Sequence, residues 1–351
     1  MSEGKTNMEA SSIAVTPSQL SDLLTALLPA REPVLIHGAP GIGKSQIVQA
    51  AASRLGYQCH VENLVSRDPT DIGGLPMILE GKPEHVHFKI GRIVTGATEP
   101  TLVFFDDLHN GMQASQAAVM QWVLDIAGNV SPHVSFVLAC NGLKHRAGGS
   151  AIIETLKSRS TILELNVRLE DWQEWALQHG VNPKVCAFLR FRPGLLHDFS
   201  PTADLTNSPS PRGWARVSRL YDMNLARGVQ LAAFAGAVGQ GAATEFLAFV
   251  RVYDSMTPPA VVFASPDSAP IPHELSALCA MALALAHAVT PATLGALARY
   301  LERVQRQAPE AVALTLMSAI TRDRSLTQSK AYIEDISCGP LGRVLIGTPR
   351  A

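Results

Sequence analysis

The sequence has no excess of charge of either sign. Among its 351 residues, 29 Lys and Arg stand against 30 Asp and Glu, which gives a formal net charge of −1 at pH 7. Proteins that bind nucleic acid or an anionic membrane surface through their overall field carry a basic excess. The balance therefore argues against nucleic acid as a partner.

Closely spaced cysteines are also missing. The chain has five cysteines, with no C-x-x-C pair among them: Cys59, Cys140, Cys186, Cys279 and Cys338. Disulfide frameworks and cysteine metal sites use close, regular spacings, which this sequence lacks. The scatter predicts reduced thiols and a cytoplasmic protein.

The chain also lacks a membrane signal. The segment from Met1 to Val15 is polar and has no basic start followed by an apolar core, so no secretory signal is expected. The longest apolar run, Leu275 to Val289, is shorter than the about 20 residues that cross a bilayer. We expect a buried helix there and no membrane partner.

What the sequence does contain is a phosphate-binding loop. An apolar run, Val34-Leu35-Ile36, leads into His37-Gly38-Ala39-Pro40-Gly41-Ile42-Gly43-Lys44-Ser45, and a helical pattern follows to Leu55. The glycines let backbone N–H groups surround phosphates, Lys44 reaches the terminal phosphates, and the Ser45 hydroxyl is placed to bind Mg²⁺. The positive end of the following helix favours the same anion. The predicted ATP-binding residues are Gly38, Ala39, Pro40, Gly41, Ile42, Gly43, Lys44, Ser45 and Gln46.

The alternative for this stretch is a chance glycine turn between a strand and a helix, which the full spacing with Lys44-Ser45 argues against. We also expect the Lys44 side chain to be exposed when the site is empty, so that its replacement would leave the fold largely intact.

Two acids follow a second apolar run. Thr101-Leu102-Val103-Phe104-Phe105 is typical of a parallel strand buried on both faces, and it ends in Asp106-Asp107. An acid at the carboxyl end of such a strand holds Mg²⁺ beside a phosphate loop, which is the role predicted for Asp106. Asp107 is predicted to orient or activate the attacking water. The alternative for Asp107 is a cap on the helix that begins near Met112.

A third predicted strand ends in an asparagine side chain. Val134 to Ala139 is apolar and places Cys140-Asn141 at its end, where Asn141 can bond the γ-phosphate or the attacking water; an asparagine there is also a common turn former. Further strands are predicted at Tyr57–Val61 and Thr161–Leu165. Strands alternating with helical segments predict an α/β fold with a parallel sheet flanked by helices.

Helical patterns alone follow Asp171. Ser210-Pro211-Arg212 has the spacing of a helix start, and Arg212 at that end opposes the helix dipole, so it calls for an anionic partner or full solvation. The pattern divides the chain into four parts. They are a flexible tail (residues 1–16), an α/β nucleotide-binding domain (17–168), a helical lid (169–256) and a linker with a C-terminal helical region (257–351).

This order of motifs resembles an AAA+ ATPase, and more narrowly a MoxR-type ATPase of the dynein-related group. The resemblance covers about Ser18 to Met256. It rests on Gly38–Ser45, on Phe105-Asp106-Asp107-Leu108 and on Phe188-Leu189-Arg190-Phe191-Arg192-Pro193 through Arg212. It implies that Asn141 is sensor 1, Arg159 the finger inserted into a neighbouring site, and Arg212 sensor 2. A finger acts only in an oligomer, so a ring, usually a hexamer, is implied.

The resemblance also implies an insert near the second helix, here Asp71 to Phe88. His85 and His87 lie two apart on one predicted strand, where a solvated hairpin is favoured over metal binding because no third ligand is near. Arg190 and Arg192 are candidates to touch nucleotide or a neighbouring subunit, or are surface arginines of the lid.

Two departures from the family pattern affect function. Asp107 stands where Glu is usual, so it must sit about one methylene nearer to the water, and slow hydrolysis is expected. Ser160 stands where an aromatic is common, which makes Arg146 the reserve candidate for the finger. The leading hypothesis is an ATP-hydrolysing ring that remodels or matures a partner protein, with a von Willebrand factor A-domain protein as partner. The alternative is a nucleotide-gated scaffold. A small-molecule kinase and a DNA motor fit the motifs and charge less well.

Overall fold

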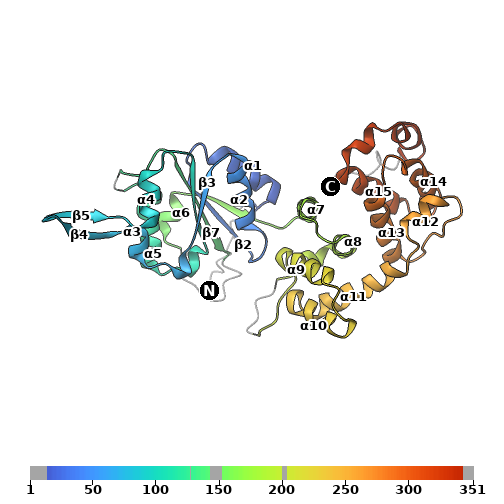
Figure 1. Ribbon diagram of the computed structural model, residues 1–351, viewed down its shortest axis with the longest axis horizontal. Coiled ribbons are helices and arrows are strands. Elements are labelled where there is room, and N and C mark those ends of the chain that lie inside the picture. The colour runs from blue at the N-terminus through green and yellow to red at the C-terminus, as the bar shows by residue number, and fades with distance from the viewer. Residues whose placement is uncertain (1–13, 127, 143–151, 200–203, 343–351) are drawn as a thin grey trace, which may run out of the picture. The chain divides into compact units, whose positions relative to one another are not determined.

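The computed structural model describes residues 14–126, 128–142, 152–199 and 204–342 (Figure 1). The chain divides into two compact units, Met1–Arg168 and Leu169–Ala351. Within the described residues, no helix combines the length and the apolar character needed to cross a bilayer.

A six-stranded parallel sheet forms the centre of the first unit, in the order β1-β8-β2-β7-β6-β3. The strands are β1 (Ala14–Val15), β2 (Val34–Gly38), β3 (Gln58–Asn63), β6 (Thr101–Asp106), β7 (Val134–Asn141) and β8 (Thr161–Leu165). The predicted parallel sheet is therefore confirmed, and each strand predicted from an apolar run is present.

Helices cover both faces of the sheet, because alternate residues of a strand point to opposite sides. The helices of this unit are α1 (Pro17–Leu27), α2 (Lys44–Arg54), α3 (Pro69–Gly73), α4 (Lys89–Gly96), α5 (Gln113–Val123) and α6 (Glu154–Ser158). On one face α1 and α2 pack against Ile36 and Phe104. On the other, α3 to α6 pack against Val103 and Phe105 (Figure 1).

The first helix begins where its sequence predicts. Thr16 accepts a hydrogen bond from the Gln19 backbone, the Gln19 side chain accepts one from the Thr16 backbone, and Pro17 occupies the first turn. This reciprocal cap satisfies two backbone donors that a helix start leaves without partners. The helix therefore begins at Pro17, directly after the Thr16 cap.

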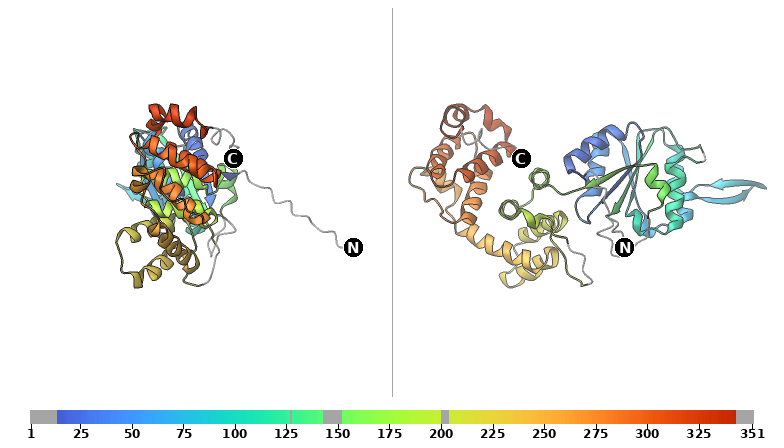
Figure 2. Two further views of the ribbon diagram at one scale, coloured as in Figure 1. Left: turned by 90° about the vertical axis from the view of Figure 1, so that its right-hand side faces the viewer. Right: turned by 180° about the vertical axis from the view of Figure 1, so that it is seen from behind.

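The insert between α3 and α4 is an antiparallel hairpin of β4 (Leu75–Leu79) and β5 (Lys82–Val86). In Figure 1, and again in the right-hand view of Figure 2, it projects away from the helices of the first unit. The four large apolar side chains of β4 are all exposed: Leu75, Met77, Ile78 and Leu79.

The second unit is helical. Its helices are α7 (Leu169–Gln178), α8 (Pro183–Phe191), α9 (Pro211–Asp222), α10 (Arg227–Val238), α11 (Gln240–Ser255), α12 (Pro259–Ala264), α13 (Leu275–Ala288), α14 (Leu294–Gln305) and α15 (Pro309–Arg322). Residues up to α11 surround an aromatic cluster in which the Phe188 and Trp214 rings lie 5.3 Å apart. An aliphatic core fills the region from α12 to α15, and α13 in it is the buried helix predicted from the longest apolar run.

One expectation about this unit is wrong in part. The proline-rich segment after Thr257 was expected to be a linker, but residues 259–264 form α12. Pro259 takes the first helical turn, where its missing N–H costs nothing, and Val262 is fully buried in the aliphatic core.

Candidate functional site

Four strand ends of the first unit meet at one edge of the sheet. Parallel strands present their carboxyl ends on the same side, and β2, β7, β6 and β3 are consecutive neighbours. They end in Gly38, Asn141, Asp106 and Asn63, respectively. The edge of an open α/β sheet where strands end in this way is the usual position of a ligand site.

The loop after β2 owes its path to glycine. A Cβ on Gly38 would lie 2.7 Å from the Leu165 backbone oxygen and 2.8 Å from the Ile42 side chain, so no larger residue fits. Gly41 and Gly43 have φ angles of +76° and +98°, which glycine adopts at little cost. Gly43 caps α2, whose first turn holds Lys44, Ser45 and Gln46.

Two apolar residues anchor this loop from below. Ala39 and Ile42 are buried in the core between the sheet, α1 and α2, and Pro40 lies between them on the loop. These two side chains fix the loop to the core, and the N-terminus of α2 follows it directly. This is the arrangement in which backbone N–H groups bind phosphate.

The Lys44 side chain is buried, with a 7% exposed fraction, so the expectation of an exposed lysine is wrong. Its ammonium donates to the backbone oxygens of Gly38 at 3.0 Å and Ala39 at 2.9 Å, and to Asn141 Oδ1 at 3.1 Å. The backbone carbonyls and the strand-end amide supply acceptors that the sequence pattern did not reveal. Lys44 thus cross-links the loop to β7.

Ser45 and Asp106 lie together, as the sequence predicts. The Ser45 hydroxyl donates to Asp106 Oδ2 at 2.5 Å. A hydroxyl and a carboxylate oxygen on facing elements are the kind of hard oxygen ligands that Mg²⁺ takes beside substrate phosphates. These two residues fit the predicted metal site.

Asp107 has an unusual backbone. Its φ of +52° is rare for a residue with a side chain, and such conformations occur mainly where the surroundings fix them. The Asp107 N–H donates to Asp106 Oδ1 at 2.9 Å, and the carboxylate accepts a hydrogen bond from Asn63 Nδ2 at 3.4 Å. The capping alternative is wrong, because Met112 caps α5 and no side chain bonds that helix end.

Asn141 is the last residue of β7, which argues against a simple turn former. Its backbone N–H donates to His109 Nδ1 at 3.3 Å, and its Nδ2 lies 3.1 Å from His109 Nε2. His109 is 2% exposed. The amide is therefore held between Lys44 and His109, at a fixed position beside the loop.

Sequence reasoning missed His109 and Asn63. Neither belongs to the motifs that were recognised, although both stand next to one: His109 follows Asp106 by three residues, and Asn63 ends the strand beside β6. A polar residue at each strand end was the available signal for Asn63. For His109 the signal was its position in the short 3₁₀ helix (Leu108–Asn110) after the acids.

The predicted arginines differ in what the structure places near them. Arg159 ends α6 and is exposed, and among the described residues its guanidinium makes no hydrogen bond or ion pair. Arg212 is exposed in the first turn of α9, in the second unit. Arg146 lies outside the described residues. The roles of these three arginines stay predictions.

Arg190 and Arg192 have partners inside the second unit. Arg190 donates to Gln173 Oε1 at 2.8 Å, and Arg192 pairs with Glu245 at 2.7 Å. Burial lowers the pKa of Arg190 from its ordinary value. These contacts favour the interpretation as structural arginines of the helical unit.

His85 and His87 belong to the base of the hairpin. Their rings lie 5.0 Å apart, and the His87 ring lies 5.1 Å from that of Trp122. Burial, followed by the charge of His85, lowers the pKa of His87. No group of three or more metal-binding side chains occurs in the part of the chain that the structure describes, so metal binding gains no support.

Comparison with known proteins identifies the segment that carries the site. Residues 34–147 match the family described as "ATPase family associated with various cellular activities (AAA)". No curated protein matches the chain.

Similar solved structures are remote. The Thermotoga maritima RuvB Holliday junction branch migration motor is 16% identical, with 82% of this chain and 86% of that chain covered and a TM-score of 0.36. The replication initiator DnaA bound to AMPPCP and single-stranded DNA is 12% identical, with 93% and 94% covered and a TM-score of 0.36. Likenesses of this degree add nothing to the assignment, which rests on the matched segment and its geometry. Residues 34–147 match the AAA ATPase family, and the chain is a P-loop ATPase.

Proposed function

We propose that the chain is a MoxR-type AAA+ ATPase that binds ATP with Mg²⁺, assembles into a ring, usually of six subunits, and uses hydrolysis to remodel or mature a partner protein. The observation that carries the proposal is the meeting of Lys44, Ser45, Asp106 and Asn141 at one sheet edge. Each of these side chains has the chemistry that phosphoryl transfer to water needs at that place.

The binding step follows from the loop. Backbone N–H groups of residues 41–46 are proposed to surround the phosphates, and the Lys44 ammonium to move from its backbone acceptors to the terminal phosphates. The Asn141 side chain, released from Lys44, then forms a hydrogen bond with the γ-phosphate or with the attacking water. Ser45 and Asp106 would hold Mg²⁺, which would supply charge neutralisation at the phosphates.

Asp107 is the residue proposed to polarise the attacking water. Its backbone conformation and the bond to Asp106 Oδ1 fix where the carboxylate begins, next to the metal residues. The carboxylate keeps acceptor sites for the attacking water beside the Asn63 hydrogen bond. Hydrolysis is proposed to be slow because the aspartate must lie about one methylene nearer to that water than a glutamate would.

The ring proposal rests on Arg159. An exposed guanidinium with no described partner is available to a neighbouring subunit, where a finger neutralises charge on the transferring group. Arg212 is proposed as sensor 2 from its place in the first turn of α9. The proposal includes four parts of the chain: a flexible tail (residues 1–16), a nucleotide-binding domain (17–168), a helical lid (169–256) and a linker with a C-terminal helical region (257–351).

The MoxR subtype and the partner are supported by the insert. A hairpin between α3 and α4 occupies the position that the resemblance implies, and its exposed apolar side chains suit contact with a protein. A von Willebrand factor A-domain protein is the proposed partner, and the free state of all five thiols is compatible with a cytoplasmic location.

Mixing two inactive variants tests the function and the ring together. Arg159→Ala leaves its own site intact and removes the finger from the neighbour, whereas Asp107→Asn leaves the finger and disables its own site. Each variant alone should lose most of its ATP turnover. For Arg159→Ala the expected fall in kcat is about 10³-fold. In mixed rings some interfaces join an intact Asp107 site to an intact Arg159, so part of the activity should return. No recovery at any ratio, in rings shown by mass measurement to have exchanged subunits, would refute the trans role.

A second candidate is a nucleotide-gated scaffold that assembles with ATP and hydrolyses it only slowly. Asp107 favours it, because an aspartate must lie about one methylene nearer to the attacking water than the usual glutamate. Turnover measured with and without the partner separates the two. Strong stimulation by the partner is incompatible with the scaffold.

A further inference from the structure

The outer edge of β3 has no strand beside it. β3 pairs with β6, and no other strand of the described residues pairs with its opposite side. The Gln58 N–H donates to the Pro100 oxygen at 2.9 Å, so the backbone groups of Gln58 point to β6. Because successive residues of a strand direct these groups to opposite sides, Cys59 and Val61 direct theirs outward. The N–H and C=O groups of these two residues are therefore open to another extended chain.

The side chains of the same two residues mark one face beside the edge. Cys59 packs toward the core that α1 and α2 cover, and Val61, two residues later, is on the same face and 41% exposed. A strand added at the edge would place apolar side chains opposite Cys59 and Val61 and cover them.

A cavity borders the edge on the other face of the sheet. Its volume is about 350 Å³, and its lining includes residues of β3, of α4 and of the segment that leads into β6: Gln58, His60, Arg92, Gly96 and Glu99. Gly96 leaves this space open, because a Cβ there would meet no atom within 4 Å. In an added strand, the side chain opposite His60 would lie on this face and enter the cavity. The cavity is near the start of β3, whereas the phosphate loop lies where the strands end.

The cavity holds a cation that no carboxylate neutralises. Arg92 is exposed, its Nε donates to the His87 backbone oxygen at 3.0 Å, and within the described ranges it has no acidic partner. Glu99 accepts a hydrogen bond from the Gln58 amide at 2.8 Å, which places the acid of the cavity at the start of β3. A carboxylate that enters beside His60 would therefore meet Arg92.

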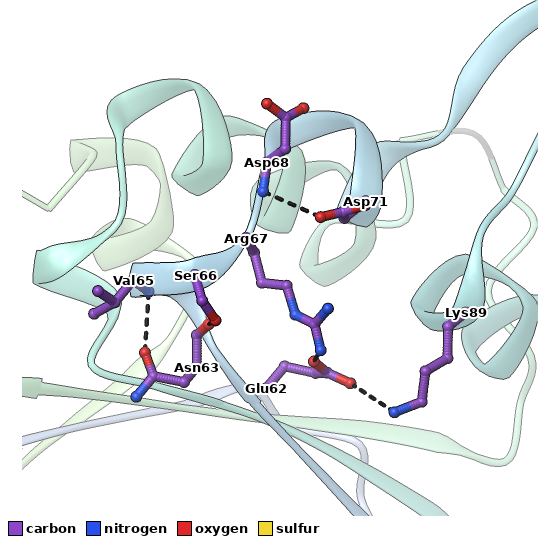
Figure 3. A network of polar contacts seen from close by, with 8 residues as sticks. All are labelled: Glu62, Asn63, Val65, Ser66, Arg67, Asp68, Asp71 and Lys89. Carbon is purple, nitrogen blue, oxygen red and sulfur yellow. Dashed lines mark hydrogen bonds and ion pairs between the residues drawn. The ribbon is translucent and has the colours of Figure 1, made fainter.

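Further along β3 the same face is also basic. Glu62 is 2% exposed, and its carboxylate lies 2.6 Å from Arg67 Nη2 and 3.6 Å from Lys89 Nζ (Figure 3). Lys89 is 72% exposed and keeps donors for a second carboxylate. The three cations Arg67, Lys89 and Arg92 thus stand against the two acids Glu62 and Glu99, and the groove favours an acidic ligand.

We propose that the groove between the free edge of β3 and α4 is a docking site for an extended acidic segment of a partner protein, which adds a strand to the sheet. The free backbone groups of Cys59 and Val61 require another extended chain as occupant. The segment presents apolar side chains opposite these two residues and an acidic side chain opposite His60, toward Arg92. This surface goes beyond the proposed function and does not depend on it, because it lies away from the nucleotide site.

The probe is the capped heptapeptide acetyl-Thr-Val-Glu-Val-Glu-Val-Thr-amide. Its side chains read the same in both directions, so it tests parallel and antiparallel addition together. A peptide with lysine in place of both glutamates is its control. Fluorescence anisotropy of the labelled peptides with the full chain gives the dissociation constant. Hydrogen exchange, followed by mass spectrometry that resolves single amides, shows which backbone groups the peptide covers.

The glutamate peptide should bind with a dissociation constant of about 0.1 mM or below, and the lysine peptide at least about tenfold more weakly. At a peptide concentration about ten times the dissociation constant, the Cys59 and Val61 amides should exchange about tenfold more slowly. The Gln58 and His60 amides face β6 and should change much less.

Val61→Pro removes an outward N–H and leaves the pairing with β6, a change that edge strands tolerate, and should raise the dissociation constant about tenfold or more. Val61→Thr keeps the N–H and the branched shape and is its matched control, with a change of less than about threefold expected. Arg92→Gln should weaken binding about tenfold. Arg299→Gln, at an exposed arginine of α14 in the second unit, should not change it.

Four results would overturn the docking site. They are no binding at about 1 mM peptide, equal affinity for the lysine peptide, bound peptide with unchanged exchange at Cys59 and Val61, and equal effects of Arg92→Gln and Arg299→Gln. Slow exchange at Cys59 and Val61 that rises with protein concentration without peptide would assign the edge to a second copy of the chain, and would overturn it as well. If Val61→Pro does not fold, Gly96→Leu decides in its place: it fills the cavity, and unchanged peptide affinity in it excludes the site.

Discussion

Replacing Lys44 by alanine tests the site most directly, because the structure gives this side chain two separate tasks. In the structure its ammonium bonds Gly38, Ala39 and Asn141 and is buried. With nucleotide it is expected to bind the terminal phosphates. The alanine variant should therefore lose stability as well as affinity.

The loss of stability follows from the acceptors that are left behind. Gly38 O, Ala39 O and Asn141 Oδ1 all lose the ammonium; Gly38 O keeps the Gly142 N–H at 3.3 Å, so the contacts to Ala39 O and Asn141 Oδ1 are the two that are counted. At about 1 kcal/mol each, the low end for a site that water can re-enter, the free energy of unfolding falls by about 2 kcal/mol. The melting temperature of the nucleotide-free protein should fall by about 4 to 8 °C.

The loss of affinity is larger. Two charge-assisted hydrogen bonds from an ammonium to phosphate contribute about 3 to 6 kcal/mol together, which corresponds to about 10²- to 10⁴-fold in the dissociation constant. Isothermal titration with ATP and Mg²⁺ measures this, and scanning calorimetry without nucleotide measures the stability.

Lys82→Ala is the control, because Lys82 is an exposed lysine of the same unit, on the hairpin. It should change neither quantity. Unchanged ATP affinity in Lys44→Ala would remove the site assignment. Lost affinity with unchanged stability would refute the buried network around the ammonium.

Three further predictions follow from single side chains. Asp106→Ala should weaken Mg²⁺-dependent ATP binding, whereas Asp107→Asn should keep binding and lose turnover; full turnover in both would disprove the roles assigned at the end of β6. Burial, followed by the neighbouring histidine, lowers the pKa of His87, so the folded hairpin base favours the neutral imidazole: its stabilisation is complete above about pH 6.5 and is lost as pH falls through the folded pKa. After division by the intrinsic exchange rate at each pH, the amide protection factors of the hairpin should therefore fall from pH 7.5 to 5, and His87→Asn should lose this dependence. Burial raises the pKa of Cys186 to about 12, so at pH 8 its thiolate fraction is about 10⁻⁴ and iodoacetamide should label exposed Cys338 first; equal rates by mass spectrometry would contradict the burial.

The sequence by itself determined the elements and the motifs. Thr16 and Ser210 indicate helix starts, because the side chain of each accepts a hydrogen bond from the backbone N–H three residues later. The structure shows both of these local hydrogen bonds. The apolar runs of β6 and β7 announce buried strands for the same local reason, and the loop from Gly38 to Ser45 carries its chemistry in its spacing.

Tertiary structure decided which side chains meet. Asn63 bonds Asp107 because β3 pairs with β6, and Asn141 reaches Lys44, 97 positions away in the chain, because β7 lies beside β2. Two of the Lys44 acceptors, the Gly38 and Ala39 backbone oxygens, belong to the same loop, but only the folded path of that loop places them against the ammonium. Strand order in a parallel sheet is set by how helices on both faces pack, which periodicity does not encode. The motifs therefore predicted the chemistry of the site. The contacts that hold Lys44 and Asp107 depend on the tertiary structure, because they form only where four strands end at the same edge of the sheet.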